Sequence, residues 1–144
     1  MNKLITKQKG LAAIEMVLVM PVMLILLVGV FEISRIFIQY TTLNKAVQAG
    51  ARYALVDIYG AQAQGAIAEE DQIKNVVVYG KRTTGSNSVL SGLTASDVSI
   101  SSTSSHITVS AVYAYMPVFA TIPFTTTSLS MNLTASASMR RGGI

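Results

Sequence analysis

The chain has 144 residues, of which 51% are hydrophobic and 12% are charged, and this length fits one domain plus a membrane anchor. It contains no cysteine and one histidine, His106, which excludes disulfides, thiolate metal sites and a cluster of histidine metal ligands. The net charge is +4, but Lys and Arg do not form a stripe interleaved with aromatic residues, so we expect no nucleic-acid partner.

A basic leader precedes a long apolar segment at the N-terminus. Residues 1–10 contain three lysines, and residues 12–31 carry Glu15 as their one charge. Because about 20 apolar residues span about 30 Å of hydrocarbon, we predict a transmembrane helix over residues 11–38. The lysines before the span place the N-terminus in the cytoplasm and the rest of the chain outside. No convincing A-x-A cleavage site directly follows the run, and this disfavours a secretory signal peptide.

Glu15 is unusual because it lies near the start of the apolar run. A carboxylate at the centre of a membrane helix costs roughly 2.5–3.5 kcal/mol, and less near the interface. One interpretation places it at the level of the lipid headgroups, where its charge suits the positive end of the helix dipole. The other gives it a role in docking between subunits.

The helix is predicted to continue beyond the membrane as an amphipathic helix to about residue 59, with Gly60 as its end. Apolar residues recur after residue 33 with the 3.6-residue period of a helix. Beyond this point, residues 60–144 form the predicted head domain, outside the cytoplasm.

Two groups of residues on this helix are candidates for contacts. Glu32 and Arg35 are three residues apart and can meet on one face, either as an interfacial ion pair or as an assembly contact. Ala46, Gly50 and Ala54 are spaced by four, and such a row of small residues allows another element to approach closely. The alternative is that alanine is simply a good helix former.

Residues 62–83 predict a second, shorter helix, with Ile73, Val76, Val77 and either Tyr79 or Gly80 facing the first helix. The run of valines in this segment also keeps a strand possible there. Residues 84–92 are rich in Ser, Thr, Gly and Asn, and this composition is typical of a loop.

The last part of the chain alternates between apolar and polar residues. This period-two pattern predicts strands over residues 97–100, 106–116 and 128–139, with a turn at 101–105 and a connection at 116–123. Alternation is typical of an antiparallel sheet that is covered on one side. We therefore predict an α+β fold in which three antiparallel strands pack on two helices.

The N-terminal residues resemble a known processing site. The run Lys-Gly-Leu-Ala-Ala-Ile-Glu, residues 9–15, followed at once by an apolar helix, looks like a type IV prepilin cleavage site. The resemblance implies that a prepilin peptidase cuts between Gly10 and Leu11, so that Glu15 becomes the fifth mature residue. The α-amino group released on Leu11 could then pair with Glu15 of a neighbouring subunit. A buried pair of this kind sets register better than it stabilises.

A longer stretch resembles the TadE family of pseudopilins of the Tad (Flp-type) pilus. The matching features are KGLAAIEMVLVMPVMLILLVGVFEISR and AVQAGARYA, including Glu32 and Arg35 after the apolar run. TadF proteins share this layout. The resemblance implies a minor pilin or pseudopilin in the bacterial inner membrane, which supports adherence and biofilm formation. Its implied partners are the membrane, the prepilin peptidase, the major pilin, sibling pseudopilins and the inner-membrane assembly platform.

The sequence contains no convincing set of catalytic residues. His106 stands beside serines at a predicted strand start, and the glycines are not followed by the G-K-[ST] of a phosphate-binding loop. We therefore expect neither an enzyme nor a cofactor. The alternative function is an unprocessed, signal-anchored envelope protein with a structural or binding domain.

Overall fold

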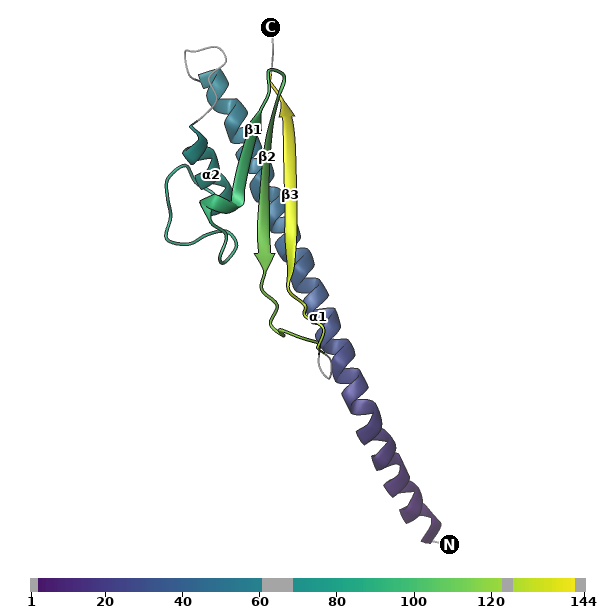
Figure 1. Cartoon of the computed structure of the whole chain (residues 1–144). Helices are drawn as coiled ribbons and strands as arrows, with labels where there is room; N and C mark the ends of the chain where they lie inside the picture. Colours follow the sequence, from purple (N-terminus) through teal and green to yellow (C-terminus); the bar gives the residue numbers. More distant parts are fainter. Residues whose placement is uncertain (1–2, 61–68, 123–125, 142–144) are drawn as a thin grey trace. The chain divides into compact units, whose positions relative to one another are not determined.

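The computed structural model describes the backbone of residues 3–60, 69–122 and 126–141, with side chains from residue 10 to residue 55 and throughout the two later ranges. The chain divides into two compact units, residues 1–35 with 117–129 and residues 36–116 with 130–144. Helix α1, Lys3–Gly60, contributes to both units (Figure 1). Each unit is described separately.

Helix α1 is continuous over Lys3–Gly60 and contains both the apolar run and its amphipathic continuation. Its backbone is already helical within the predicted basic leader. Pro21 lies inside the helix, a position that membrane helices tolerate because neighbouring groups can satisfy the freed carbonyl. The helix ends at Gly60, the residue at which the sequence predicts a stop.

Helix α2, Glu70–Tyr79, lies in the second unit and is shorter than predicted. Gly80 follows it with a φ of 68°, and its backbone N–H donates to the carbonyl of Val76 at 3.0 Å. A left-handed residue at this position ends a helix, and glycine adopts it without the steric cost of a Cβ. The predicted end at residue 83 is therefore wrong, while the predicted start at residue 62 lies outside the described residues.

The buried face of α2 only partly matches the prediction. Ile73 and Val77 are buried as expected. Val78 is buried although it was not predicted, and the other predicted residues, including Val76, are half-buried or exposed. The loop after α2 returns beside Val78, because the backbone N–H of Val89 donates to the Val78 carbonyl at 2.7 Å. The helical period of the sequence does not predict this contact with the loop, and so it does not predict that Val78 is buried and Val76 only half-buried.

Strands β1 (Val98–Ser102), β2 (His106–Tyr115) and β3 (Met131–Arg140) form one antiparallel sheet in the order β1-β2-β3. This confirms the predicted three-stranded sheet and the α+β class. Alternate residues of β2 are buried on one face, as the sequence predicts: Ile107, Val109, Ala111, Tyr113 and Tyr115.

The strand ends differ from the predicted ones for local reasons. A 3-10 turn, Ala95–Asp97, precedes β1, and Asp97 Oδ2 accepts the backbone N–H of Thr94 at 2.9 Å, so β1 begins after this turn. Ser101 and Ser102 pair with β2, which narrows the predicted turn. Strand β3 begins at Met131 and not at residue 128, because Ser128 pairs with Thr121 in the connection between β2 and β3.

The core of the second unit lies between the sheet, α2 and the second half of α1 (Figure 1). Helix α1 contributes residues spaced by three and four, Leu43, Val47, Ala51 and Ala54, all fully buried. Leu90, in the predicted loop, and Leu93, which follows that loop, also join the core. Burying each large aliphatic side chain contributes about 1.5–3 kcal/mol, so this packing holds the unit together.

The first unit contains the connection between β2 and β3, Pro117–Leu129, together with the first part of α1. Its described parts, residues 117–122 and 126–129, pair in an antiparallel arrangement through Thr121 and Ser128, and together they are called the hairpin below. The backbone N–H of Ile122 donates to the carbonyl of Thr127 at 3.1 Å, and that of Leu129 donates to Ala120 at 3.2 Å. Some backbone N–H and carbonyl groups of the hairpin are therefore hydrogen-bonded to each other.

Candidate functional site

The apolar part of α1 is exposed along its length. None of the side chains from residue 10 to residue 31 is buried, and Leu11, Leu18 and Leu27 are 71%, 71% and 66% exposed. Leaving a large apolar side chain in water forgoes about 1.5–3 kcal/mol. Among the described residues, the structure has one helix that is long and apolar enough to cross a membrane. This helix is suited to act as a membrane anchor.

The predicted cleavage bond, between Gly10 and Leu11, lies inside α1. A Cβ added at Gly10 would meet no atom within 4 Å, so nothing in the described structure covers this bond. Cleavage there requires the helical turn to open locally. Glycine makes this opening easier, because it is about 1 kcal/mol less favourable than alanine in a helix.

Glu15 lies one turn after Leu11, and both side chains are exposed. Residues four apart share one face of a helix. Within the described part of the chain, no hydrogen bond or ion pair involves the Glu15 carboxylate. The Glu15 carboxylate is therefore accessible on this face of α1.

Glu32 follows the apolar run and is 2% exposed. Its Oε1 accepts the backbone N–H groups of Val118 at 2.6 Å and Phe119 at 3.0 Å. Hydrogen bonds to a carboxylate are roughly twice as strong as those between neutral groups. Glu32 therefore ties the base of the hairpin to α1 within the first unit.

Arg35 does not share this contact. It is half-buried, and its Nη1 atom is buried with no hydrogen-bond partner in the described part of the chain. The ion pair found among the described residues joins Lys74 to Glu70 at 2.8 Å. The pairing of Glu32 with Arg35 that the sequence allows is not formed among the described residues. The Glu32 carboxylate instead accepts two backbone N–H groups.

The row of small residues faces the inside of the second unit. Ala46 is 8% exposed and Ala54 is fully buried. A Cβ added at Gly50 would overlap with Cγ2 of Val77 and lie 3.6 Å from the carbonyl oxygen of Ile73. The element that approaches closely at Gly50 is therefore α2 of the same chain.

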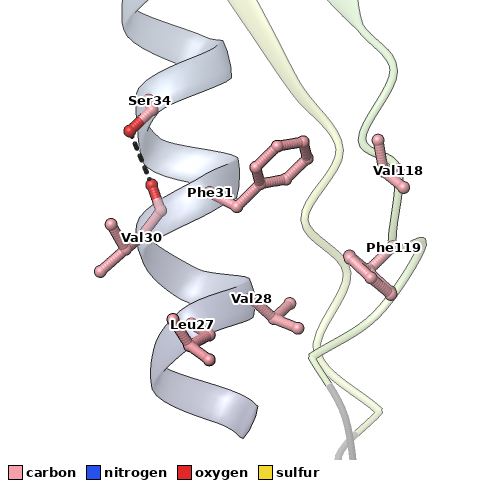
Figure 2. A pocket seen from close by; sticks show the side chains of 7 residues that line it. All are labelled: Leu27, Val28, Val30, Phe31, Ser34, Val118 and Phe119. Carbon is pink, nitrogen blue, oxygen red and sulfur yellow. Dashed lines mark hydrogen bonds between the residues drawn. The ribbon is translucent and has the colours of Figure 1, made fainter.

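An apolar groove lies in the first unit beside Glu32. It has a volume of about 570 Å³ and is lined by Leu27, Val28, Val30, Phe31, Ser34, Val118 and Phe119. Figure 2 shows Val28 and Phe31 pointing from the helix towards the segment that carries Val118 and Phe119. The Ser34 hydroxyl donates to the carbonyl of Val30 at 2.8 Å, so this polar group already has a partner (Figure 2).

No local pattern in the sequence predicts the contact between Glu32 and the hairpin, which joins residues 86 and 87 positions apart. The composition of the connection is the one sequence signal that points to it. The connection contains the run Met-Pro-Val-Phe-Ala-Thr-Ile-Pro-Phe, residues 116–124, which is strongly apolar for a loop that joins two strands. An apolar run of this kind is expected to pack against another apolar surface.

Comparison with known proteins gives a match for the N-terminal part of the chain. Residues 10–52 match the model of a family described as TadE-like protein. This confirms the resemblance to that family noted in the sequence, and it covers the apolar run, Glu15, Glu32 and Arg35. No curated protein and no solved structure matches the chain.

Proposed function

From the TadE-like segment at residues 10–52, which associates the chain with the Tad pilus system, we propose that this protein is a minor pilin or pseudopilin. In this proposal a prepilin peptidase cuts between Gly10 and Leu11, and the mature subunit supports adherence and biofilm formation. The chain acts as a structural subunit and not as an enzyme. The observation that carries the proposal is a TadE-like sequence on an exposed apolar helix.

The proposed mechanism follows from the two halves of α1. The exposed apolar half stays in the inner membrane or passes into a bundle of similar helices, since both environments bury its side chains. The released ammonium group of Leu11 pairs with Glu15 of a neighbour and sets the register between subunits. The other half of α1 supports the sheet, which the subunit presents outside the membrane.

The proposed partners are the peptidase, the major pilin, sibling pseudopilins and the inner-membrane assembly platform. In the proposed topology the N-terminus is cytoplasmic and the sheet unit is periplasmic or extracellular. Three lysines before the apolar run support this orientation.

N-terminal sequencing tests the processing step. The full chain is extracted from membranes with and without the cognate peptidase, and we expect Leu11 as the new first residue only when the peptidase is present. Gly10→Val should abolish the cleavage, because a branched side chain obstructs a site built for glycine. The control is Gly29→Val, since Gly29 also lies in α1 with no atom within 4 Å of an added Cβ.

Two outcomes would count against the proposal. Retention of Met1 in the presence of an active peptidase would favour the unprocessed, signal-anchored envelope protein. Equal cleavage of the Gly10→Val and unchanged chains would show that the cut lies elsewhere.

A further inference from the structure

The hairpin of the first unit lies beside the part of α1 that is predicted to lie in lipid. Leu27, Val28 and Phe31 belong to the apolar run of residues 12–31, and they line one groove with Val118 and Phe119. At about 1.5 Å of rise per residue, Leu27 lies about 6 Å along the helix axis from Phe31, towards the membrane centre. A segment that packs here therefore reaches the hydrocarbon.

The backbone of the hairpin is prepared for such an environment. Backbone N–H and C=O groups in a bilayer must be satisfied within the protein, because lipid tails offer no hydrogen bonds. Hydrogen bonds between Ile122 and Thr127 and between Leu129 and Ala120 join the two described arms of the hairpin. Glu32 accepts the N–H groups of Val118 and Phe119, which lie before the paired part of the hairpin.

The side chains of the groove are apolar and accessible. Val118 is 56% exposed and Phe119 is 38% exposed, while Val30 and Phe31 on the helix are 64% and 54% exposed. This surface is continuous with the exposed apolar surface of α1 that the membrane covers. The polar side chain in its lining, Ser34, already donates its hydroxyl to the carbonyl of Val30.

We propose that residues 117–122 and 126–129 form a membrane-embedded wedge, held against α1 by Glu32, and that the groove between this wedge and α1 takes the acyl chains of the lipid leaflet around residues 27–31. The chain therefore contacts the bilayer through two segments that are far apart in the sequence. The proposal rests on the membrane anchor of the proposed function, and on neither cleavage at Gly10 nor assembly into a pilus.

Tryptophan fluorescence tests this directly, because the chain contains no tryptophan. The full chain carrying Phe119→Trp is reconstituted at low density into phosphatidylcholine vesicles whose acyl chains are brominated either near the ester or near the chain end. We expect a blue-shifted emission that is quenched more strongly by bromine near the ester. Val118→Trp provides a second variant in case the first fails to fold.

Two control variants bracket the result. Leu24→Trp lies in the apolar run and should be quenched by bromine deeper in the chains, whereas Val112→Trp lies on the exposed face of β2 and should emit as a water-exposed residue. If Leu24→Trp is unquenched, the membrane anchor itself fails. If Leu24→Trp is quenched and neither hairpin variant is, the wedge is overturned and the anchor stands.

The emission also separates lipid from protein as the occupant. A blue shift of Phe119→Trp without quenching by either brominated lipid means that the introduced indole is covered by protein, either its own chain or a second copy, and this overturns the proposal. An emission equal to that of Val112→Trp means that water fills the groove, and this result also overturns the proposal.

The role of Glu32 is tested in the Phe119→Trp background. Glu32→Ala removes the acceptor of both N–H groups, so we expect the quenching near the ester to fall and the emission to shift to the red. Glu32→Gln keeps an oxygen acceptor and should restore most of the quenching. Equal quenching in all three chains would show that Glu32 does not hold the wedge in the bilayer.

Discussion

At the scale of single residues, Gly50 has a defined neighbour. Ala46 and Ala54, four positions away on either side, are buried on the same helix. At Gly50 there is no room for a Cβ, because Val77 of α2 occupies that position. Helices α1 and α2 can therefore approach closely at Gly50 because glycine has no side chain.

This contact makes a prediction about stability. Gly50→Leu should lower the free energy of unfolding by about 1–3 kcal/mol, because the larger side chain forces α2 away from α1. Ala49→Leu is the matched control, since Ala49 is the neighbouring residue and is exposed. Thermal unfolding of the detergent-solubilised chain, followed by circular dichroism, measures both. Equal unfolding temperatures would mean that α2 does not pack closely at Gly50.

Glu32 also has a neighbour that its position in the sequence does not reveal. Its spacing from Arg35 suggests a pair on one helix face. Its carboxylate instead accepts two N–H groups from the hairpin, and the side chain is 2% exposed. A charge beside an apolar run is tolerated here because the protein supplies the hydrogen bonds that lipid cannot.

At the scale of elements, the end of α2 depends on one backbone conformation. Gly80 has a φ of 68°, in the left-handed region, and its N–H closes the last turn onto Val76. After it, the chain returns to bring Leu90 and Leu93 into the core. The position of these two leucines therefore depends on the turn at Gly80.

Gly80→Ala should lower the free energy of unfolding by about 1–2 kcal/mol, because the left-handed conformation brings a Cβ too close to the following carbonyl oxygen. Gly80→Asn should cost less, since asparagine adopts this conformation more readily. Lys81→Ala, at the next and exposed position, serves as the control. Chemical denaturation of the detergent-solubilised chain gives the three values. An alanine variant as stable as the control would contradict the role assigned to Gly80.

At the scale of the whole molecule, the chain combines an apolar anchor with a sheet whose outer face is polar. Outward residues of β2 and β3 pair through hydroxyl groups, as Thr108 does with Ser138 at 3.1 Å. The inner face buries its apolar side chains in the core. We therefore expect the apolar helix to lie in lipid and the polar face of the sheet to face water.

The absence of cysteine from the sequence allows this topology to be tested with single substitutions. We expect Ser136→Cys, on the exposed face of β3, to react with a membrane-impermeant maleimide in intact spheroplasts. Leu18→Cys, in the apolar run, should stay unlabelled until detergent is added. Labelling of Ser136→Cys only after lysis would place the sheet in the cytoplasm and reverse the proposed orientation.

Local patterns in the sequence determine much of this protein. The apolar run and the 3.6-residue period predict α1 to its end at Gly60, and the alternation in residues 106–116 predicts the buried face of β2. The motifs around Gly10, Glu15, Glu32 and Arg35 identify the TadE-like segment. These features depend on near neighbours in the chain, so the order of residues is enough to predict them.

The tertiary structure alone decided which distant groups meet. It placed the hairpin N–H groups of Val118 and Phe119 on Glu32, Val77 against Gly50, and the returning loop beside Val78. The sequence named candidate residues for some of these contacts but not their partners. The reason is physical: hydrogen bonding and close packing depend on distances in space between segments that lie far apart along the chain, and no local period encodes those distances.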